Sequence, residues 1–473
     1  MTMLKSFCFL LIIHVALPLF MGYAQDDQSG FISIDCGIPK GSKYTDTKTG
    51  INYVSDDGFV EGGISQEISS KYVAEVNDLH LKTLRSFPTN IRNCYTLQPK
   101  QGKNNRYLIR VWIMYGNYDS KGNTPQFDLY LGADLWNTVN IAEPSDQYYY
   151  EIIHLTSSNY IHICLVNTGH GDPFISAIEL RLLDITMYLP QFLSLDVVER
   201  AVFTTDAIRY QDDKYDRIWY PQSFSTGLKR VQTTNTISSG PLQVPLKVMR
   251  TALTNVDSRD GGITHTWDAT IASNYIAYIH FAEVEILKEN EKREFNVYLN
   301  DNYWDGPISP SNIITTLKTA SPLTGFSNYT IRMTRTSSST LPPTMNAIEV
   351  YMPKDFKQQQ TDDQDAAAIW STKSSYGMKR NWQGDPCSPK QYVWNGLKCS
   401  YKDITTPRII SLDLSYNNLT GNVPKFLASL NFLAVLNLTG NKFTRPLPEE
   451  LLAKSKNGLL LLRFTLKVYS KKN

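Results

Sequence analysis

Two pairs of adjacent aspartates are the residues of this chain best suited to acid–base chemistry, Asp56-Asp57 and Asp212-Asp213. A glycoside hydrolase needs two carboxyl groups on either side of a glycosidic bond. Neighbouring residues of a strand point to opposite faces, so neither pair forms such a dyad by itself. We therefore interpret both pairs as loop or turn-capping residues rather than as catalytic ones.

Three evenly spaced histidines and one acidic loop are the next candidates, in this case for binding a metal. No carboxylate accompanies His154, His162 and His170 at a metal-ligand interval. The loop at residues 119–123 has a lysine in its middle and lacks EF-hand spacing. We expect packed or surface histidines, a hairpin loop and no cofactor. The sequence also lacks the glycine-rich loop and catalytic-loop aspartate of a kinase, and we expect no enzymatic activity.

The composition is that of a folded protein without affinity for nucleic acid. Apolar residues make up 42 % of the 473 residues, enough to form real cores. The formal charge is +2, and no long basic run interleaves with aromatic residues. Because nucleic-acid binding needs a basic footprint, nucleic acid is excluded as the expected partner.

Residues 1–24 have the pattern of a secretory signal peptide. Lys5 supplies the positive charge, residues 7–20 are mostly apolar, and small residues precede a cleavage site after Ala24. No later stretch approaches the roughly 18 apolar residues of a membrane-spanning helix. We expect the chain to be secreted into the extracellular space and to associate with the plasma membrane only through its partners.

Cysteines and glycosylation sequons fit that oxidising route. An odd number of cysteines follows the signal peptide, so at least one stays free or pairs outside the chain: Cys36, Cys94, Cys164, Cys387 and Cys399. Three Asn-x-Ser/Thr acceptors are candidates for N-glycosylation: Asn328, Asn418 and Asn437.

The elements that position these residues come from a duplicated all-β unit. Residues 106–132 alternate apolar and polar side chains on both sides of a loop, which predicts two half-buried strands. Residues 274–300 repeat this arrangement, and the two pairs of aspartates belong to another matched block. We place the first unit at residues 30–185 and the second at residues 199–352, each as a jelly roll or sandwich.

A different architecture follows the two units. Residues 353–365 are polar and predict a linker. Residues 366–405 begin with a helical pattern that places Ala366, Ile369 and Trp370 on one apolar face, and they contain a Trp-rich segment with two cysteines. Residues 408–455 repeat a Leu/Asn pattern with a period of 24 residues, typical of two leucine-rich repeats. Residues 456–473 form an atypical tail, in which Thr465 stands where a third repeat would have Asn.

Several motifs give these segments a specific resemblance. Residues 275–284 and 295–300 resemble the central strands of malectin, a carbohydrate-binding lectin, and two such units resemble the malectin-like ectodomain of plant receptor kinases. Residues 384–387, Gly-Asp-Pro-Cys, resemble the signature in the repeat cap of that family. The resemblance implies tandem all-β malectin-like domains, of the jelly-roll or β-sandwich type, followed by a short α/β leucine-rich-repeat solenoid.

The resemblance also implies disulfides. The cap of such repeats is stapled by a disulfide, which here corresponds to Cys387 and Cys399, and closing that loop stabilises by roughly 3 kcal/mol. A second pairing, Cys36 with Cys94, is suggested because both belong to the first unit. Cys164 lies in a strand that is apolar on both faces, where we expect a packed thiol.

A ligand site is implied in the first unit. Malectin brings aromatic residues and an aspartate to its sugar, and the matching positions carry Tyr115, Tyr118 and Asp172. In the second unit Glu285 and Ile286 replace the stacking residues. Structural packing is the alternative role for all three first-unit residues. The cleft between the two units is the other candidate site, because ligands favour domain junctions.

Two classes of function follow from these patterns. The first is an extracellular recognition protein for a cell-wall carbohydrate or a peptide. The alternative is a soluble co-receptor or decoy that contacts full-length receptor kinases through its repeats. This second class is suggested because family members continue into a membrane span and a kinase, whereas this sequence does neither.

Overall fold

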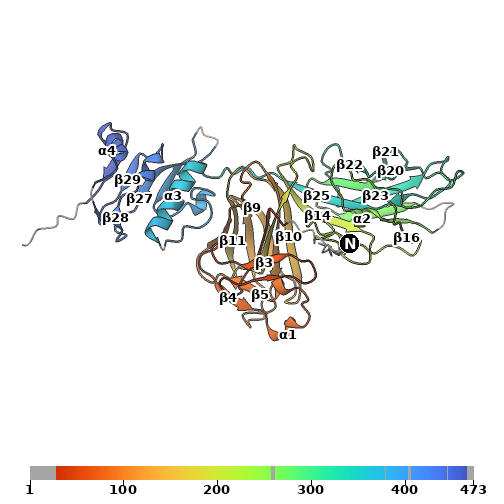
Figure 1. Cartoon of the computed structure of the whole chain (residues 1–473), viewed down its shortest axis with the longest axis horizontal. Helices are drawn as coiled ribbons and strands as arrows, with labels where there is room; N and C mark the ends of the chain where they lie inside the picture. The colour runs from red at the N-terminus through yellow and green to blue at the C-terminus, as the bar shows by residue number, and fades with distance from the viewer. Residues whose placement is uncertain (1–27, 257–261, 379, 403–405, 445, 466–473) are drawn as a thin grey trace, which may run out of the picture.

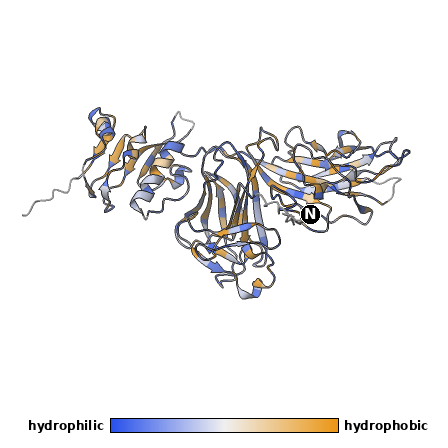
Figure 2. Cartoon of the chain, viewed as in Figure 1, coloured by the Kyte–Doolittle hydropathy of each residue, from blue (hydrophilic) through white to orange (hydrophobic). Residues whose placement is uncertain are grey.

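Three modules lie side by side, with the first β unit in the middle (Figure 1). The computed structural model describes residues 28–256, 262–378, 380–402, 406–444 and 446–465. The expected signal peptide and residues 466–473 of the expected tail lie outside these ranges. Apolar residues run through the strands of both β units, as expected for packed sheets (Figure 2). The tandem all-β architecture with a C-terminal repeat solenoid is thereby confirmed.

The elements of the first unit run from residue 31 to residue 183. They are β1 (Phe31–Asp35), β2 (Lys43–Thr45), β3 (Asn52–Ser55), β4 (Ile64–Glu67), α1 (Ser70–Val73), the 3-10 helix η1 (Leu79–Leu81), β5 (Thr83–Ser86), β6 (Arg92–Leu97), β7 (Arg106–Met114), β8 (Gln126–Leu131), β9 (Asp134–Asn140), β10 (Gln147–Leu155), β11 (Ile161–His170), β12 (Phe174–Ile175) and β13 (Ala177–Leu183).

The second unit begins at residue 194, so the boundary expected at residue 199 falls inside a strand. Its elements are β14 (Ser194–Val202), β15 (Tyr220–Pro221), β16 (Leu228–Gln232), α2 (Leu246–Met249), β17 (Thr251–Asn255), β18 (Ile263–Asp268), β19 (Ile276–Phe281), β20 (Phe295–Leu299), β21 (Asn302–Ile308), β22 (Thr315–Lys318), β23 (Asn328–Arg335), β24 (Thr344–Met345) and β25 (Ala347–Lys354).

One large sheet runs through both units. Its order is β2-β3-β1-β13-β7-β10-β14-β25-β19-β22, with β15 beside β14. The series β1-β13-β7-β10 of the first unit is thus repeated as β14-β25-β19-β22 in the second. The two series meet where β10 pairs antiparallel with β14, with Ile152 opposite Asp196. The sheets β6-β11-β8-β9 and β18-β23-β20-β21 supply the second layer of each sandwich.

The strands at the centre of this sheet are more buried than their alternation predicts. All nine residues of β7 and all six of β19 are buried. The expectation of a half-buried strand is therefore wrong for β7, because neighbouring strands flank it on both sides and its polar residues meet buried partners. The strands β8 and β20, which face solvent on one side, do show the alternating burial.

A network of buried charges links the units where their sheets join. The Arg110 guanidinium donates to Glu151 (Nε–Oε2, 2.7 Å) and Glu179 (Nη1–Oε2, 2.5 Å). It also donates to the main-chain oxygen of Asp216 (Nη2–O, 2.6 Å). Glu151 accepts from Arg200 of the second unit as well (Nη1–Oε1, 2.8 Å). All five side chains are at most 2 % exposed, so their charges depend on one another for compensation.

The charge of Glu179 is maintained by its cationic neighbours. Burial by itself raises the pKa of a carboxyl group, but Arg209, Arg110 and Arg181 outweigh burial and hold the pKa of Glu179 well below its ordinary value. A carboxyl pKa that folding lowers adds stability above the unfolded pKa, and this stability is lost as the pH falls. Glu349 of the second unit has a lowered pKa too, with burial opposed by His280 and Arg200.

The pairing of the cysteines in the first unit differs from the expected one. Cys94 is bonded to Cys164, whereas Cys36 is free and buried. The pairing of Cys36 with Cys94 is therefore wrong, as is the packed thiol at Cys164. The physical reason is strand register: β6 and β11 are antiparallel neighbours that place Cys94 directly opposite Cys164. Cys36 follows β1, which belongs to the other sheet.

The last module is a capped solenoid. Its elements are α3 (Asp363–Tyr376), the 3-10 helix η2 (Lys390–Tyr392), β26 (Leu397–Ser400), β27 (Arg408–Asp413), β28 (Thr420–Asn422), the 3-10 helix η3 (Lys425–Ser429), β29 (Val435–Asn437), β30 (Lys442–Thr444), α4 (Glu449–Lys456) and β31 (Leu461–Arg463).

The leucines and asparagines of the repeats have their expected roles. Leu412, Leu436 and Leu462 are in register on the parallel strands β27, β29 and β31. The Asn441 side-chain amide donates to the main-chain oxygens of Leu414 and Leu438, at 2.7 and 3.1 Å. Because β31 lies in the segment expected to be an atypical tail, that segment supplies the strand of a third repeat.

The segment expected to be a linker is held against the first unit. The Asp134 carboxylate of β9 accepts from the main-chain N–H groups of Lys357 and Gln358 at 3.2–3.3 Å. The helix α3 starts earlier than the expected residue 366, since Asp362 caps it by accepting from the main-chain N–H of Gln364. The repeats are thereby docked on the first unit rather than on the second.

Replacing Arg110 tests the buried charge network. Arg110→Met removes the cation that Glu151 and Glu179 share and leaves these buried carboxylates with fewer cationic partners, and we expect the free energy of unfolding to fall by about 3–5 kcal/mol. Arg332→Met is the matched control, because Arg332 pairs with Asp301 at the surface, where the expected loss is below about 1 kcal/mol. Equal losses in urea denaturation would contradict a structural role for the network.

Asp35 predicts how stability changes with pH. Burial raises the pKa of this carboxyl to about 7, even though Thr83 and Tyr44 both donate to it at 2.8 Å. A carboxyl pKa raised by folding favours the folded state at low pH, and this stability is lost as the pH rises towards 7. Relative to Asp35→Asn, the wild type should lose about 1.4 kcal/mol per pH unit between about pH 5 and 7. Parallel stability–pH curves for the two proteins would refute the raised pKa.

Candidate functional site

The three residues expected to bind a saccharide in the first unit do lie together, in the loops after β7 and before β12. The Tyr115 hydroxyl donates to the Asp119 carboxylate at 2.6 Å, and the rings of Tyr115 and Tyr118 are 5.5 Å apart. The Lys121 ammonium is 3.4 Å from the carboxylates of both Asp119 and Asp172. The structure thus gathers the predicted residues into one cluster.

Tyr115 does not fit the role expected of it. Its side chain is completely buried among the apolar core of the first unit, so its ring offers no face to a sugar. The physical reason is packing against Phe174, whose ring also contacts Tyr118 at 5.4 Å. Of the predicted residues, Tyr118 and Asp172 are partly exposed, and Asp172 already has Lys121 as its ion-pair partner.

The junction between the two β units, the other expected site, is occupied by side chains that pair with one another. The charges around Arg110 fill its centre, and the Tyr188 hydroxyl bonds the Glu349 carboxylate and the Tyr351 hydroxyl at 3.0 Å each. The side chains of Tyr188, Glu349 and Tyr351 are buried and hydrogen-bonded to one another. We therefore assign this junction a structural role.

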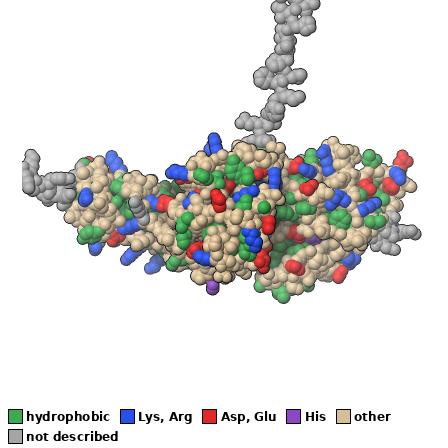
Figure 3. All heavy atoms as spheres, turned by 90° about the horizontal axis from the view of Figure 1, so that it is seen from below, with side chains coloured by type: hydrophobic (Ala, Val, Ile, Leu, Met, Phe, Trp, Pro, Cys, Tyr) green, Lys and Arg blue, Asp and Glu red, His purple; other side chains and the backbone are tan. Residues whose placement is uncertain are grey.

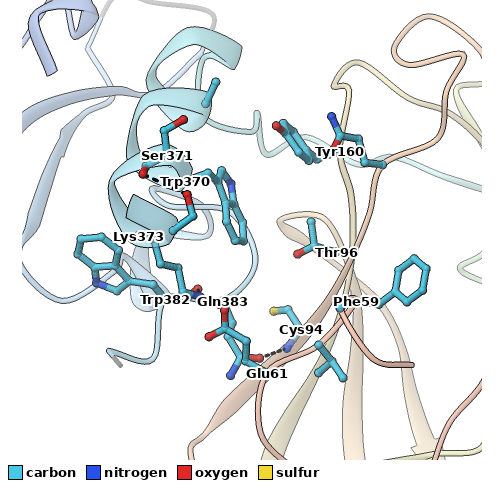
Figure 4. A pocket seen from close by; sticks show the side chains of 15 residues that line it. Phe59, Glu61, Cys94, Thr96, Tyr160, Trp370, Ser371, Lys373, Trp382 and Gln383 are labelled. Carbon is cyan, nitrogen blue, oxygen red and sulfur yellow. Dashed lines mark hydrogen bonds and ion pairs between the residues drawn. The ribbon is translucent and has the colours of Figure 1, made fainter. Parts of the chain in front are cut away.

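The structure offers a different junction, between the first unit and the repeat cap (Figure 4). A cavity of about 590 Å³ opens there, within the size range of ligand pockets. One wall comes from the loop after β3 and from β6, and the other from α3 and the segment that follows it. Among the residues that line the cavity are Phe59, Glu61, Thr96, Tyr160, Trp370, Lys373 and Gln383.

Aromatic rings form the floor of this cavity. Tyr160 and Trp370 lie with nearly parallel rings, 6.4 Å apart, although they belong to different modules. His162 does not itself line the cavity, but its ring is 6.2 Å from that of Trp370 and nearly parallel to it. Burial lowers the pKa of His162 to about 3, so this imidazole is neutral near neutral pH. The rings of Tyr160 and Trp370 thus give the cavity an aromatic surface, and the imidazole behind Trp370 adds no charge to it.

One ion pair spans the junction. The buried Lys373 ammonium is 2.7 Å from the Glu61 carboxylate and donates to the main-chain oxygen of Trp382 at 2.5 Å. The Gln383 side chain accepts from the main-chain N–H of Cys94 at 2.9 Å. Since Lys373 and Glu61 compensate each other, the site suits a neutral ligand that stacks on rings and forms hydrogen bonds.

The Gly-Asp-Pro-Cys segment holds this wall in place. The buried Asp385 carboxylate accepts from the main-chain N–H groups of Thr361 (2.8 Å) and Ser388 (2.7 Å). The structure pairs Cys387 with Cys399, the pair that the resemblance implies. The disulfide between Cys94 and Cys164 strengthens the opposite wall, because Cys94 lines the cavity.

Sequence reasoning missed most of this site. Trp370 was placed on the apolar face of a predicted helix, which was the available signal, but Glu61, Tyr160 and Gln383 carried none. The lining residues Gly58 and Gln383 lie 325 positions apart, and only the docking of two modules brings such residues together.

The three glycosylation sequons differ in accessibility. Asn328 and Asn418 are exposed. Asn437 is half-buried in β29, and its side-chain amide donates to the Asp413 carboxylate at 3.2 Å. These positions make Asn328 and Asn418 the accessible acceptors.

Comparison with known families and relatives agrees with this architecture. The malectin-like domain profile matches residues 34–353, and the leucine-rich repeat profile matches residues 408–430. A probable LRR receptor-like serine/threonine-protein kinase of Arabidopsis thaliana, At1g05700, is 42 % identical over 447 residues, which cover 91 % of this chain and 51 % of the relative. The A. thaliana kinase IOS1 is 38 % identical over 438 residues, which cover 91 % of this chain and 48 % of IOS1. The chain spans about half the length of these curated relatives.

Solved structures show the same fold. The ANX2 ectodomain from Arabidopsis thaliana has a TM-score of 0.58 at 16 % identity, covering 70 % of this chain and 99 % of its own. The plant receptor-like kinase FER has the same TM-score and sequence identity, and the match covers 69 % of this chain and 96 % of the FER chain. A complex of the plant peptide RALF23 with FER and LLG2 also matches, with a TM-score of 0.54 and a sequence identity of 14 %. The match covers 69 % of this chain and 96 % of the matched chain.

The described part of the chain has no helix long and apolar enough to cross a membrane. The malectin-like match covers nearly the whole of both β units, and the repeat match covers the segment from β27 to η3 that follows them. The chain belongs to the malectin-like domain family, with leucine-rich-repeat receptor-like kinases of Arabidopsis thaliana among its relatives.

Proposed function

We propose that this chain acts outside the cell as the ligand-recognition region of a receptor-like protein. The observation that carries the proposal is the cavity between the first unit and the repeat cap, which both modules line. Ligand sites occur preferentially at such junctions. The family relationship to receptor-like kinases supports the same role.

The chemistry of the lining favours an uncharged ligand. Trp370, Tyr160 and Phe59 present apolar ring surface, while Thr96 and Gln98 supply hydrogen-bonding groups. A cell-wall oligosaccharide has alternating apolar ring faces and hydroxyls that match such a surface. A peptide segment with an apolar side chain matches it as well, and peptide binding is supported by the solved complex of FER with RALF23.

A second candidate is recognition through the repeats themselves. Tyr416 is 79 % exposed and Phe432 is 46 % exposed on the solenoid, and exposed aromatic side chains are enriched in protein interfaces. In this case the chain would work as a co-receptor or decoy that contacts other receptors. The saccharide contacts expected of Tyr118 and Asp172 remain a further proposal for the first unit.

Filling the cavity tests the main proposal. Ala367 lines the cavity from an exposed position on α3, so Ala367→Trp should block it without disturbing the core. We expect at least a tenfold loss of affinity, about 1.4 kcal/mol, for the oligosaccharide or peptide that the wild type selects from glycan and peptide arrays.

The matched control is Gln364→Trp, since Gln364 is also exposed on α3 but does not line the cavity. This variant should bind like the wild type, and both variants should unfold at the same temperature. Unchanged binding by Ala367→Trp, with a loss in Tyr416→Ala, would favour the repeats as the recognition surface instead.

A further inference from the structure

An exposed aromatic surface covers one edge of the second unit, away from Glu285 and Ile286. Tyr303 is 58 % exposed and Phe326 is 51 % exposed, and both line a cavity of about 280 Å³. The turn between β20 and β21 and the segment before β23 form its walls, with Asn300 and Asn302 among the lining residues. By contrast, charged side chains of both signs are interspersed over the face of the protein shown in Figure 3.

A glycosylation acceptor stands next to this surface. Asn328 begins β23, is exposed, and lies two residues after Phe326. Within the described structure, no hydrogen bond from another residue engages its side-chain amide. Thr330, which completes the sequon, lies in the same strand. The acceptor is therefore both accessible and adjacent to an exposed ring.

The backbone around this acceptor is fixed rather than loose. The Gly325 N–H donates to the main-chain oxygen of Ile271 at 3.2 Å, and the Ala269 N–H donates to that of Ser327 at 2.8 Å. The ring of Phe326 is further supported by Tyr329, at 5.6 Å in an edge-on arrangement. Phe326 is thus held at a set position relative to Asn328 before any sugar is attached.

We propose that an N-linked glycan on Asn328 folds back onto this surface and that its first N-acetylglucosamine packs on Phe326. A pyranose ring has an apolar C–H face that an aromatic ring can cover, and polar edges that amide groups can bind. The cavity is slightly smaller than ordinary ligand pockets, so it suits one sugar unit rather than a chain. The glycan would then cover apolar surface that the second unit otherwise exposes to water.

A double-mutant cycle tests this proposal independently of ligand binding at the cap junction. The wild type, Phe326→Ala, Asn328→Gln and the double variant are secreted from a eukaryotic host that adds high-mannose glycans. Glycopeptide mapping should show Asn328 occupied. Phe326→Ala should lower the Tm by about 2 °C in the glycosylated protein and much less in the Asn328→Gln background. When the glycan is trimmed to its first sugar, Phe326→Ala should still lower the Tm more than it does in the Asn328→Gln background.

Ile286→Ala is the matched control, since Ile286 is an exposed apolar residue of the same unit, at 82 % exposure, and does not line the cavity. Its effect on the Tm should be the same with and without the glycan. The proposal is overturned if Asn328 is unoccupied, if Phe326→Ala costs the same in both backgrounds, or if trimming to the first sugar removes the difference.

Discussion

The pairing of β10 with β14 is the constraint on which the rest of this structure depends. It joins two copies of a four-strand series into one sheet, and it requires the polar residues of the central strands to be buried. Arg110, Glu151 and Arg200 satisfy that requirement by compensating one another across the join. Because a buried charge without a partner is costly, the network permits essentially one relative orientation of the two units.

This fixed orientation leaves a different junction for recognition. The repeat cap docks on the first unit through a few polar contacts, chiefly Asp134 with the segment before α3 and Glu61 with Lys373. Such contacts are weaker than a shared sheet. The interface therefore encloses a cavity rather than a packed core, and aromatic residues of both modules are available to a ligand.

The two disulfides strengthen the two walls of that cavity. Cys94–Cys164 crosses neighbouring strands of the first unit, and Cys387–Cys399 closes the cap. A cross-link limits the freedom of the unfolded chain, so each wall keeps its shape without help from a ligand. A glycan on Asn328 would add protection at the far module, where the aromatic rings around Phe326 would otherwise remain exposed.

The sequence by itself determined the duplication, the half-buried strands β8 and β20, the solenoid leucines and asparagines, and the family resemblance, because these depend on local periodicity. It also identified Trp370 as part of an apolar helix face. Strand register decided the rest. Register paired Cys94 with Cys164 instead of Cys36, and tertiary packing buried Tyr115 against Phe174 and enclosed β7 between two neighbouring strands. The cavity at the repeat cap was decided by docking, since Glu61, Tyr160 and Gln383 meet only when distant modules pack together, and no local pattern in the sequence predicts that contact.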